Sequence, residues 1–251
     1  MTKKKSVVIT GGSRGIGKFL TKAFLLDGYN VIVGSRNINE LKELDNKNLI
    51  FVSVDVVKEQ SHSMLAQKAI KATGSIDVWI NNVGISEWKP ITEIDEGFFD
   101  KLMNVNLKSA FWGCKTAAGF MKKNGGSIIN ISSIAGKRGS SNNSMYSATK
   151  FGMNGLTQSL AKELGVFGIR VNAICPVLVT TEGLIKALNT KYSPANENPE
   201  EFLEKFRKEN AATGCLPDGN DVAQMAIFLA NKKNKSITGQ CINVDSGVFP
   251  Q

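Results

Sequence analysis

Short apolar runs alternate with stretches of helical periodicity along the whole chain. Seven apolar runs predict strands: 6–10, 31–34, 49–54, 76–81, 127–132, 169–175 and 241–244. Five periodic stretches predict helices: 16–27, 63–73, 98–123, 145–164 and 221–230. The strands are continuously apolar, which indicates a sheet covered on both faces. We therefore expect an α/β fold, in which right-handed βαβ units build a doubly wound, parallel seven-stranded sheet between two helical layers.

The length of 251 residues fits one large domain, and we interpret 1–251 as a single unit. The stretch from 182 to about 215 interrupts the alternation with Pro194, Pro199 and the amphipathic run "EEFLEKFRKE". A long segment of this kind is typical of a lid over a ligand site, because ligands bind outside the carboxyl ends of parallel strands. An ordinary pair of surface helices is the alternative.

Charge and composition narrow the class of protein. The formal net charge is +9, but the lysines are scattered and no aromatic residues interleave with them, so we expect no nucleic-acid partner. No apolar run is long enough for a membrane span, and the basic start "MTKKKSVVIT" is interpreted as a first strand. Four widely spaced cysteines indicate free thiols in a reducing compartment, so we expect a cytoplasmic protein.

The chain contains a single histidine, His62, in the polar stretch "KEQSHSML". A Ser-His-Asp hydrolase or a histidine zinc site would depend on this residue. Neither a G-x-S-x-G motif nor a cysteine cluster accompanies it, so we expect no metal. We interpret His62 as a solvated residue at the start of a helix, and we expect acid–base chemistry without imidazole.

The first strand runs directly into the glycine-rich sequence "TGGSRGIG" at 10–17. Glycine permits positive φ and lets a phosphate approach the backbone closely. The helix that follows offers free N–H groups and the positive end of its dipole to an anion. The position at the first strand–helix junction predicts a dinucleotide site. Its predicted contacts are Gly11, Ser13, Arg14, Gly15, Ile16 and Gly17.

The end of the second strand indicates which dinucleotide is bound. NAD-binding folds place an acidic residue there to hold the ribose 2′-hydroxyl. This chain has Ser35 and Arg36 instead, and Arg14 lies in the glycine loop. Guanidinium groups pair well with a 2′-phosphate, so NADP(H) is favoured over NAD(H). Two solvent-exposed arginines without a ligand are the alternative.

Tyr146 and Lys150 stand four residues apart in "YSATK". On a helix these positions share a face, so the two side chains project together. A free tyrosine has a pKa of about 10, and a nearby ammonium group favours the phenolate. We expect Lys150 to lower the pKa of Tyr146, which could then exchange a proton with an alcohol or a carbonyl group.

Together these motifs resemble the short-chain dehydrogenase/reductase family, and the resemblance spans essentially the whole chain. The matching segments are TGGSRGIG (10–17), NNVG (81–84), VNL (105–107), INISSIAG (129–136), YSATK (146–150) and ITGQCINVDSG (237–247). The resemblance implies a Rossmann-type fold and an oxidoreductase that moves hydride between a nicotinamide and a carbonyl or secondary alcohol. It also implies a homotetramer, paired through the helices near 98–123 and 145–164.

The resemblance assigns roles to individual residues. It implies a catalytic set of Asn106, Ser133, Tyr146 and Lys150, with Ser132 as the competitor of Ser133. Tyr146 and Lys150 would also contact the cofactor. Further implied cofactor contacts are Asp55, Val56, Asn82, Val83, Gly84, Pro176 and Thr181. The family's Pro-Gly turn is Pro176-Val177 here, so Thr180 competes with Thr181.

The substrate remains open between several classes. The chain is most similar to 3-oxoacyl-acyl-carrier-protein reductases, but Asn124 and Phe167 stand where those carry arginines near the cleft. A sugar, polyol or other small-ketone dehydrogenase is an equal alternative. Trp88, Met145 and Val177 are candidate pocket walls. A catalytically silent dinucleotide-binding regulator is the alternative outside the enzymes.

Overall fold

The computed structural model describes residues 5–37, 41, 44 and 46–250. Seven strands form one sheet, in the order β3-β2-β1-β4-β5-β6-β7, and every neighbouring pair is parallel. The strands are β1 (Ser6–Thr10), β2 (Asn30–Ser35), β3 (Leu49–Ser53), β4 (Val78–Asn81), β5 (Gly126–Ile131), β6 (Ile169–Pro176) and β7 (Cys241–Val244). All seven predicted strands and their parallel arrangement are confirmed.

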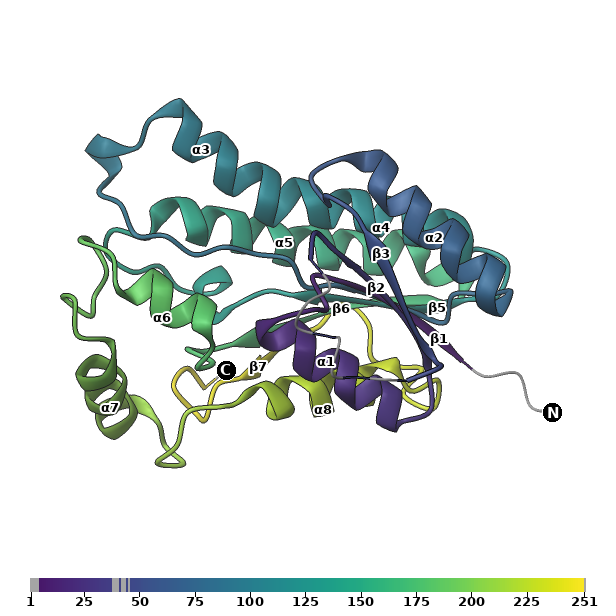
Figure 1. The fold of residues 1–251 in the computed structure, drawn as a ribbon. Coiled ribbons are helices and arrows are strands. Elements are labelled where there is room, and N and C mark those ends of the chain that lie inside the picture. Colours follow the sequence, from purple (N-terminus) through teal and green to yellow (C-terminus); the bar gives the residue numbers. More distant parts are fainter. Residues whose placement is uncertain (1–4, 38–40, 42–43, 45, 251) are drawn as a thin grey trace.

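Helices cover both faces of this sheet, as Figure 1 shows. They are α1 (Gly15–Leu26), α2 (Glu59–Thr73), α3 (Glu96–Leu102), α4 (Ser109–Met121), α5 (Ser144–Leu164), α6 (Glu182–Leu188), α7 (Pro199–Asn210) and α8 (Gly219–Ala230). Val7 and Ile9 of β1 pack in one cluster with α1 and α8. Val8, between them, packs in the other with α2, α4 and α5. Alternate residues thus face opposite layers, which confirms the three-layer prediction.

The predicted helix 98–123 is two helices joined by a π-helical turn, Met103–Lys108. The predicted long helical region is confirmed, but its π-helical turn was not predicted. The apolar periodicity persists through the turn, so a single wider turn leaves no signature in the hydrophobic pattern. Such π turns occur mostly inside α-helices and often at functional sites. Here the turn carries Asn106.

The sheet changes its direction of winding at β1, which lies between β2 and β4. Ligands of such sheets bind outside the carboxyl ends of the strands at this switch point. The glycine-rich loop follows β1 there, and the segment after β4 reaches the same edge. Among the described residues no helix is long and apolar enough to cross a membrane.

The segment from 182 to 215 contains α6 and α7, which lie together at one side of the molecule (Figure 1). Its buried residues Leu188, Ala195 and Leu203 form a separate apolar cluster. Trp88 and Leu178, from outside the segment, pack against that cluster. The segment is therefore an ordered helical unit beside the carboxyl edge of the sheet, and its role as a lid stays a prediction.

Candidate active site

The glycine-rich loop has a backbone that side chains would obstruct. Gly11 and Gly15 have φ of +65° and +51°, the left-handed region that favours glycine. A Cβ on Gly17 would lie 2.0 Å from the carbonyl oxygen of Gly11. Arg14 occupies the N-cap of α1 without a side-chain cap, so the first turn keeps its N–H groups for an anion. The loop therefore fits a pyrophosphate.

The segment after β4 fixes this loop from the neighbouring strand. Asn82 Nδ2 donates to the carbonyl oxygens of Thr10 at 3.0 Å and Gly11 at 3.1 Å. A Cβ added to Gly11 would lie only 2.7 Å from Cγ2 of Val83. Asn82 and Val83 thus contact the glycine-rich loop directly. Gly84, which follows them, is exposed.

The predicted 2′-phosphate site lies where the glycine loop meets the end of β2. Ser13 Oγ and Ser35 Oγ are 2.8 Å apart. Arg14 and Arg36, next to these serines in the chain, are both exposed. Two hydroxyls and two guanidinium groups at one edge offer the donors that a phosphate monoester accepts.

Tyr146 and Lys150 occupy the first two turns of α5 on one face. Lys150 is 3% exposed, and its Nζ donates to the carbonyl oxygen of Ile131 at 2.8 Å. The same Nζ lies 5.7 Å from the centre of the Tyr146 ring. Ser133 forms a hydrogen bond with the Tyr146 hydroxyl, whereas buried Ser132 donates to the backbone oxygen of Lys150. The geometry thus favours Ser133 over Ser132.

Asn106 is fully buried, and both polar atoms of its side chain form hydrogen bonds. Its Oδ1 accepts from Ile85 N at 2.8 Å, and its Nδ2 donates to Ile85 O at 2.9 Å and to Thr149 Oγ1 at 3.2 Å. Thr149 is the residue before Lys150 in α5. Asn106 therefore joins the π turn to the loop after β4 and to the helix that carries Tyr146 and Lys150.

Asn106→Ala should destabilise the protein by about 1–3 kcal/mol, because the backbone N–H and C=O of half-buried Ile85 lose their partner. We expect carbonyl reduction to slow by roughly tenfold as α5 loses this anchor. Thermal unfolding and the rate of NADPH oxidation measure the two effects. Wild-type stability in the variant would contradict this structural role.

Burial controls the proton affinities of the central pair. It raises the pKa of Tyr146 to about 12, although the hydrogen bond with Ser133 acts in the opposite direction. It lowers the pKa of Lys150 to about 8. The expected lowering of the pKa of Tyr146 is therefore not found in this structure, where desolvation of the phenol is the largest cause and raises it. A protonated Tyr146 at neutral pH is suited to donating a proton to a carbonyl oxygen.

These pKa values predict a pH profile for reduction. If Tyr146 gives up its proton, a charged Lys150 would stabilise the phenolate that remains. The kcat/KM for reduction should therefore be constant below a pH of about 8 and fall above it, as Lys150 loses its charge. Initial rates over roughly pH 6 to 10 measure this profile. A Lys150→Arg variant that is active should lack the decline, and the same decline in that variant would contradict the assignment.

Asp55 and Val56 follow β3 at the same edge of the sheet. Asp55 is exposed and Val56 is buried. Val54 N, just before them, donates to Ser35 O at 3.1 Å, which places the loop beside the end of β2. The resemblance to the family implies that this loop contacts the adenine of the cofactor, and that role stays a prediction.

The turn after β6 concerns two questions from the sequence, the conformation at Val177 and the choice between Thr180 and Thr181. Pro176 ends β6, and buried Val177 donates its N–H to Val244 O at 3.3 Å. The positive φ, +30°, falls on Leu178 and not on Val177. Thr181 caps α6 by accepting from Leu184 N at 3.2 Å, and it lies 3.8 Å from where a Gly15 Cβ would be. Thr181 thus borders the glycine loop, while Thr180 is exposed.

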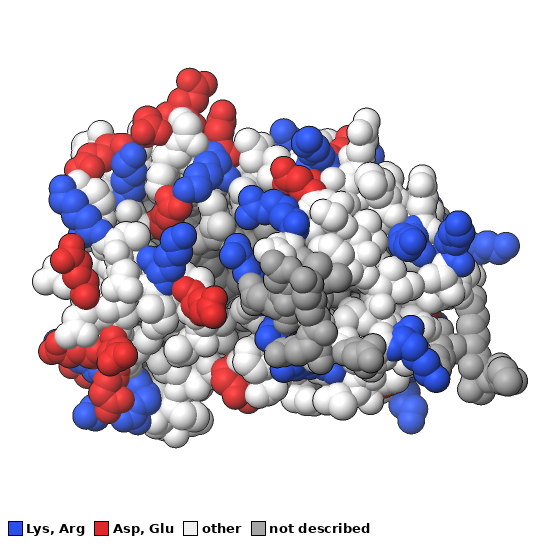
Figure 2. All heavy atoms as spheres, in the orientation of Figure 1, with Lys and Arg blue, Asp and Glu red and all other residues white. Residues whose placement is uncertain are grey.

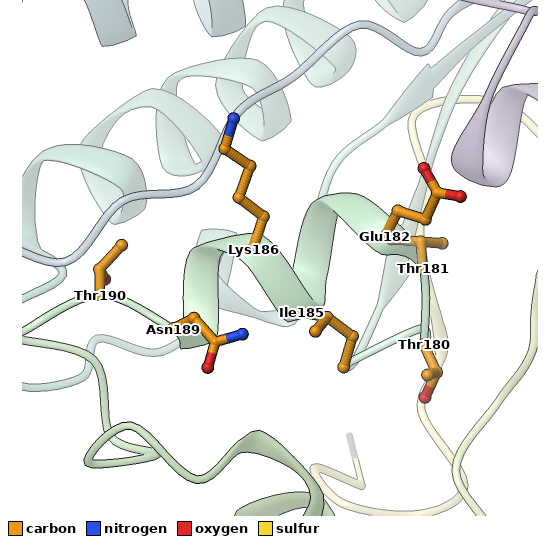
Figure 3. A pocket seen from close by; sticks show the side chains of 7 residues that line it. All are labelled: Thr180, Thr181, Glu182, Ile185, Lys186, Asn189 and Thr190. Atoms are coloured by element: carbon orange, nitrogen blue, oxygen red, sulfur yellow. The ribbon is translucent and has the colours of Figure 1, made fainter.

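A cavity of about 740 Å³ opens beside this turn, along α6. It is lined by Thr180, Thr181, Glu182, Ile185, Lys186, Asn189 and Thr190 (Figure 3). Lys186 and Ile185 point to opposite sides of α6 in this view. The sequence predicted the segment 182–215 as a lid but did not single out Glu182, Lys186 or Asn189, because no motif marks these residues.

His62 is not solvated as expected. Its side chain is fully buried, and its Nε2 lies 2.8 Å from the carbonyl oxygen of Val56. Its ring centre is 6.1 Å from that of Trp79 in β4. The spacing of 62, 65, 66 and 69 is that of one helix face, so periodicity could have revealed this burial.

The described residues contain no cluster of three or more His, Cys, Asp or Glu that could hold a metal.

A comparison with protein families decides the identity of this fold and site. Residues 5–191 match the model of the short chain dehydrogenase family. The chain belongs to the short-chain dehydrogenase family. Short-chain dehydrogenases with curated names support this assignment. A diacetyl reductase [(S)-acetoin forming] of Staphylococcus epidermidis is 36% identical, with 97% of this chain and 98% of that protein aligned.

Two further short-chain dehydrogenase relatives extend the comparison. A 3-oxoacyl-[acyl-carrier-protein] reductase of Chlamydia muridarum is 33% identical, with 97% of each chain aligned. The solved structure of ElxO with NADP bound is 33% identical and superposes with a TM-score of 0.88, over 99% of this chain and all of that one. The protein is accordingly an oxidoreductase that interconverts carbonyl and alcohol groups with a nicotinamide dinucleotide.

Proposed function

We propose that this protein is an NADP(H)-dependent reductase of a small ketone or diketone. The observation that carries the proposal is the group formed by Ser133, Tyr146 and Lys150 beside the glycine loop, with the phenol protonated at neutral pH. Bound NADPH would supply the hydride. The diacetyl reductase among the relatives supports a small substrate.

The proposed roles follow from the positions of the three side chains. Ser133 donates a hydrogen bond to the substrate oxygen and polarises the carbonyl group. Tyr146 transfers its proton to that oxygen while hydride reaches the carbonyl carbon, so the C=O double bond becomes a secondary alcohol. Lys150 stabilises the phenolate left behind, and Asn106 holds the helix that carries both residues.

We propose Arg14, Arg36, Ser13 and Ser35 as the 2′-phosphate site that makes NADP(H) the preferred cofactor. Arg36→Ala should weaken NADPH binding by about 10- to 100-fold, because charge-assisted hydrogen bonds to the phosphate are lost. NADH binding should stay nearly constant. Fluorescence titration of both cofactors measures this preference. Arg207→Ala removes a partly exposed guanidinium that pairs with Glu204, and it serves as the control. An unchanged preference in Arg36→Ala would overturn the 2′-phosphate assignment.

The second candidate substrate is a 3-oxoacyl thioester, which the Chlamydia relative supports. The positions expected to carry arginines near the cleft do not support it. Phe167 follows the last turn of α5, whereas Tyr146 lies in the first, so the two are about 30 Å apart. Within one chain Asn124 and Phe167 do not flank the cleft. A panel of diketones, sugars, polyols and 3-oxoacyl thioesters ranks the candidates by kcat/KM.

We propose a cytoplasmic homotetramer. Exposed aromatic side chains on and beside α4 and α5 support self-association: Phe111, Phe120, Phe151 and Phe167. The four cysteines are unpaired, which supports a reducing compartment. Basic and acidic side chains are interspersed over the left part of the face in Figure 2, and on the right the basic ones are separated by uncharged atoms, which does not favour a continuous basic stripe for nucleic acid. Light scattering after gel filtration measures the assembly.

A catalytically silent regulator would bind the cofactor without reducing any carbonyl compound. The convergence of Asn106, Ser133, Tyr146 and Lys150 supports the enzyme, because a binding protein has no need of this group. NADPH binding without turnover across the substrate panel would favour the regulator.

A further inference from the structure

The buried imidazole of His62 lies directly beneath the loop proposed to hold the adenine. His62 stands in the first turns of α2, and Val56 lies in the connection between β3 and that helix. The carbonyl oxygen of Val56 can only accept, so Nε2 carries the proton and donates to it at 2.8 Å. One side chain thus holds the backbone that immediately follows Asp55.

The other side of the ring connects to the loop after β4. The ring packs against Trp79, which is fully buried and whose Nε1 donates to Asn81 Oδ1 at 2.9 Å. Asn81 precedes Asn82, the residue that holds the glycine loop. His62 therefore bonds directly to the loop after β3 and is linked through Trp79 and Asn81 to the segment after β4. Both segments belong to the proposed cofactor site.

The second ring nitrogen has no partner. His62 Nδ1 is buried and makes no hydrogen bond. In the neutral ring Nδ1 is an acceptor, and leaving it without a donor is tolerated at some cost. Protonation would create a buried cationic N–H without an acceptor, which is far more costly. Burial accordingly lowers the pKa of His62 below its ordinary value, while the bond to Val56 and the charge of Glu59 act in the opposite direction.

The surroundings of the ring contain few charges. Glu59, one turn earlier in α2, pairs with Lys115 of α4 at 2.8 Å. Asp55 lies in the connecting loop, and its side chain is exposed. The buried residues that β1, β2 and α4 contribute to this layer include Val8, Ile32 and Cys114. The Cys114 thiol is neutral, because burial raises its pKa to about 12. A proton on His62 would therefore place a positive charge inside an otherwise uncharged part of this layer.

We propose that His62 is a positioning residue for the adenine end of the cofactor, and that its protonation releases this loop. The inference rests on the proposed cofactor site. Neutral His62 holds Val56 and keeps the loop ready for adenine. A proton on Nδ1 requires the first turn of α2 to open toward water, which breaks the bond to Val56. Cofactor affinity should therefore fall as the pH falls through the lowered pKa of His62.

Three variants separate positioning from packing, with 2′,5′-ADP as the probe. His62→Phe keeps a ring against Trp79 but removes the donor, so affinity at neutral pH should fall by about tenfold. His62→Gln restores a donor that does not titrate, so affinity should return to within about twofold. Its remaining acid dependence should be only that of the phosphates of the probe, which titrate at a pH of about 6. Ala69→Gly perturbs the same buried face of α2 two turns later and should leave affinity unchanged. With NADPH, the loss in His62→Phe should appear in KM.

The single histidine also gives one NMR signal that reports on this site alone. Its imidazole resonance should titrate below the ordinary midpoint of about 6.5, and 2′,5′-ADP should lower the midpoint further. Wild-type affinity in His62→Phe, or a midpoint insensitive to 2′,5′-ADP, would overturn the inference while the proposed function stands. If wild type binds neither 2′,5′-ADP nor NADPH, the proposed function fails and the inference fails with it.

Discussion

Tyr146→Phe should bind NADPH like the wild type and reduce carbonyl compounds about 1,000-fold more slowly. The substitution removes only the phenolic oxygen, which is the proposed proton donor, and general acid catalysis contributes about 100- to 10,000-fold. The ring remains to pack beside Lys150, whose Nζ keeps its bond to Ile131 O. Single-turnover oxidation of bound NADPH measures the chemical step separately from binding.

Ser133→Ala provides the companion measurement to this first prediction. Ser133 would polarise the carbonyl group without transferring a proton, so its loss should cost less than the loss of Tyr146. Ser132→Ala is the matched control, because that hydroxyl bonds to the backbone of Lys150. A rate in Tyr146→Phe within tenfold of the wild type would show that the proton comes from another group.

Gly17→Ala should weaken cofactor binding by roughly 100-fold and destabilise the protein. The new Cβ would lie 2.0 Å from Gly11 O and 2.8 Å from Asn82 Nδ2, which is closer than real Cβ atoms approach. The obstructing atom at 2.0 Å belongs to the backbone of the glycine loop, so relief requires the loop itself to move. Overpacking of this kind costs about 1–3 kcal/mol, and the displaced backbone is the proposed pyrophosphate site.

Gly155→Ala is the matched control for Gly17→Ala. Gly155 also lies within a helix, but a Cβ there meets nothing within 4 Å. Alanine should therefore stabilise α5 by about 0.5–1 kcal/mol and leave cofactor binding unchanged. Titration with NADPH and thermal unfolding of both variants decide the outcome. Equal NADPH affinity in the two variants would contradict the role of the glycine loop.

The sheet could be predicted from the sequence because burial on both faces leaves a strong pattern. The centre of the run "SVVIT" is apolar, from Val7 to Ile9, and all five of its residues are buried in β1. Helix interruptions leave a weaker trace, so the π turn at 103–108 was missed although Asn106, which it carries, was expected in the catalytic set. Its partners, Ile85 and Thr149, are distant in sequence and became visible only in the fold.

Proton affinities were the least predictable part of the site. Spacing alone placed Lys150 beside Tyr146, but burial decides the sign of the shift, and burial is a property of the tertiary structure. The turn after β6 shows the same limit. Val177 replaces the expected glycine, and the chain responds by placing the positive φ on Leu178. Val177 donates its N–H to Val244 O of a distant strand, a contact that the sequence does not reveal.

The most direct test of the central claim is isotope transfer from NADPH deuterated at C4 of the nicotinamide. Wild-type protein is incubated with this NADPH and 2,3-butanedione, and the product is analysed by mass spectrometry and NMR. The account predicts one deuterium on the new carbinol carbon, formed by the wild type and nearly absent with Tyr146→Phe. Unlabelled product, or equal labelling rates in the two proteins, would contradict hydride transfer assisted by Tyr146.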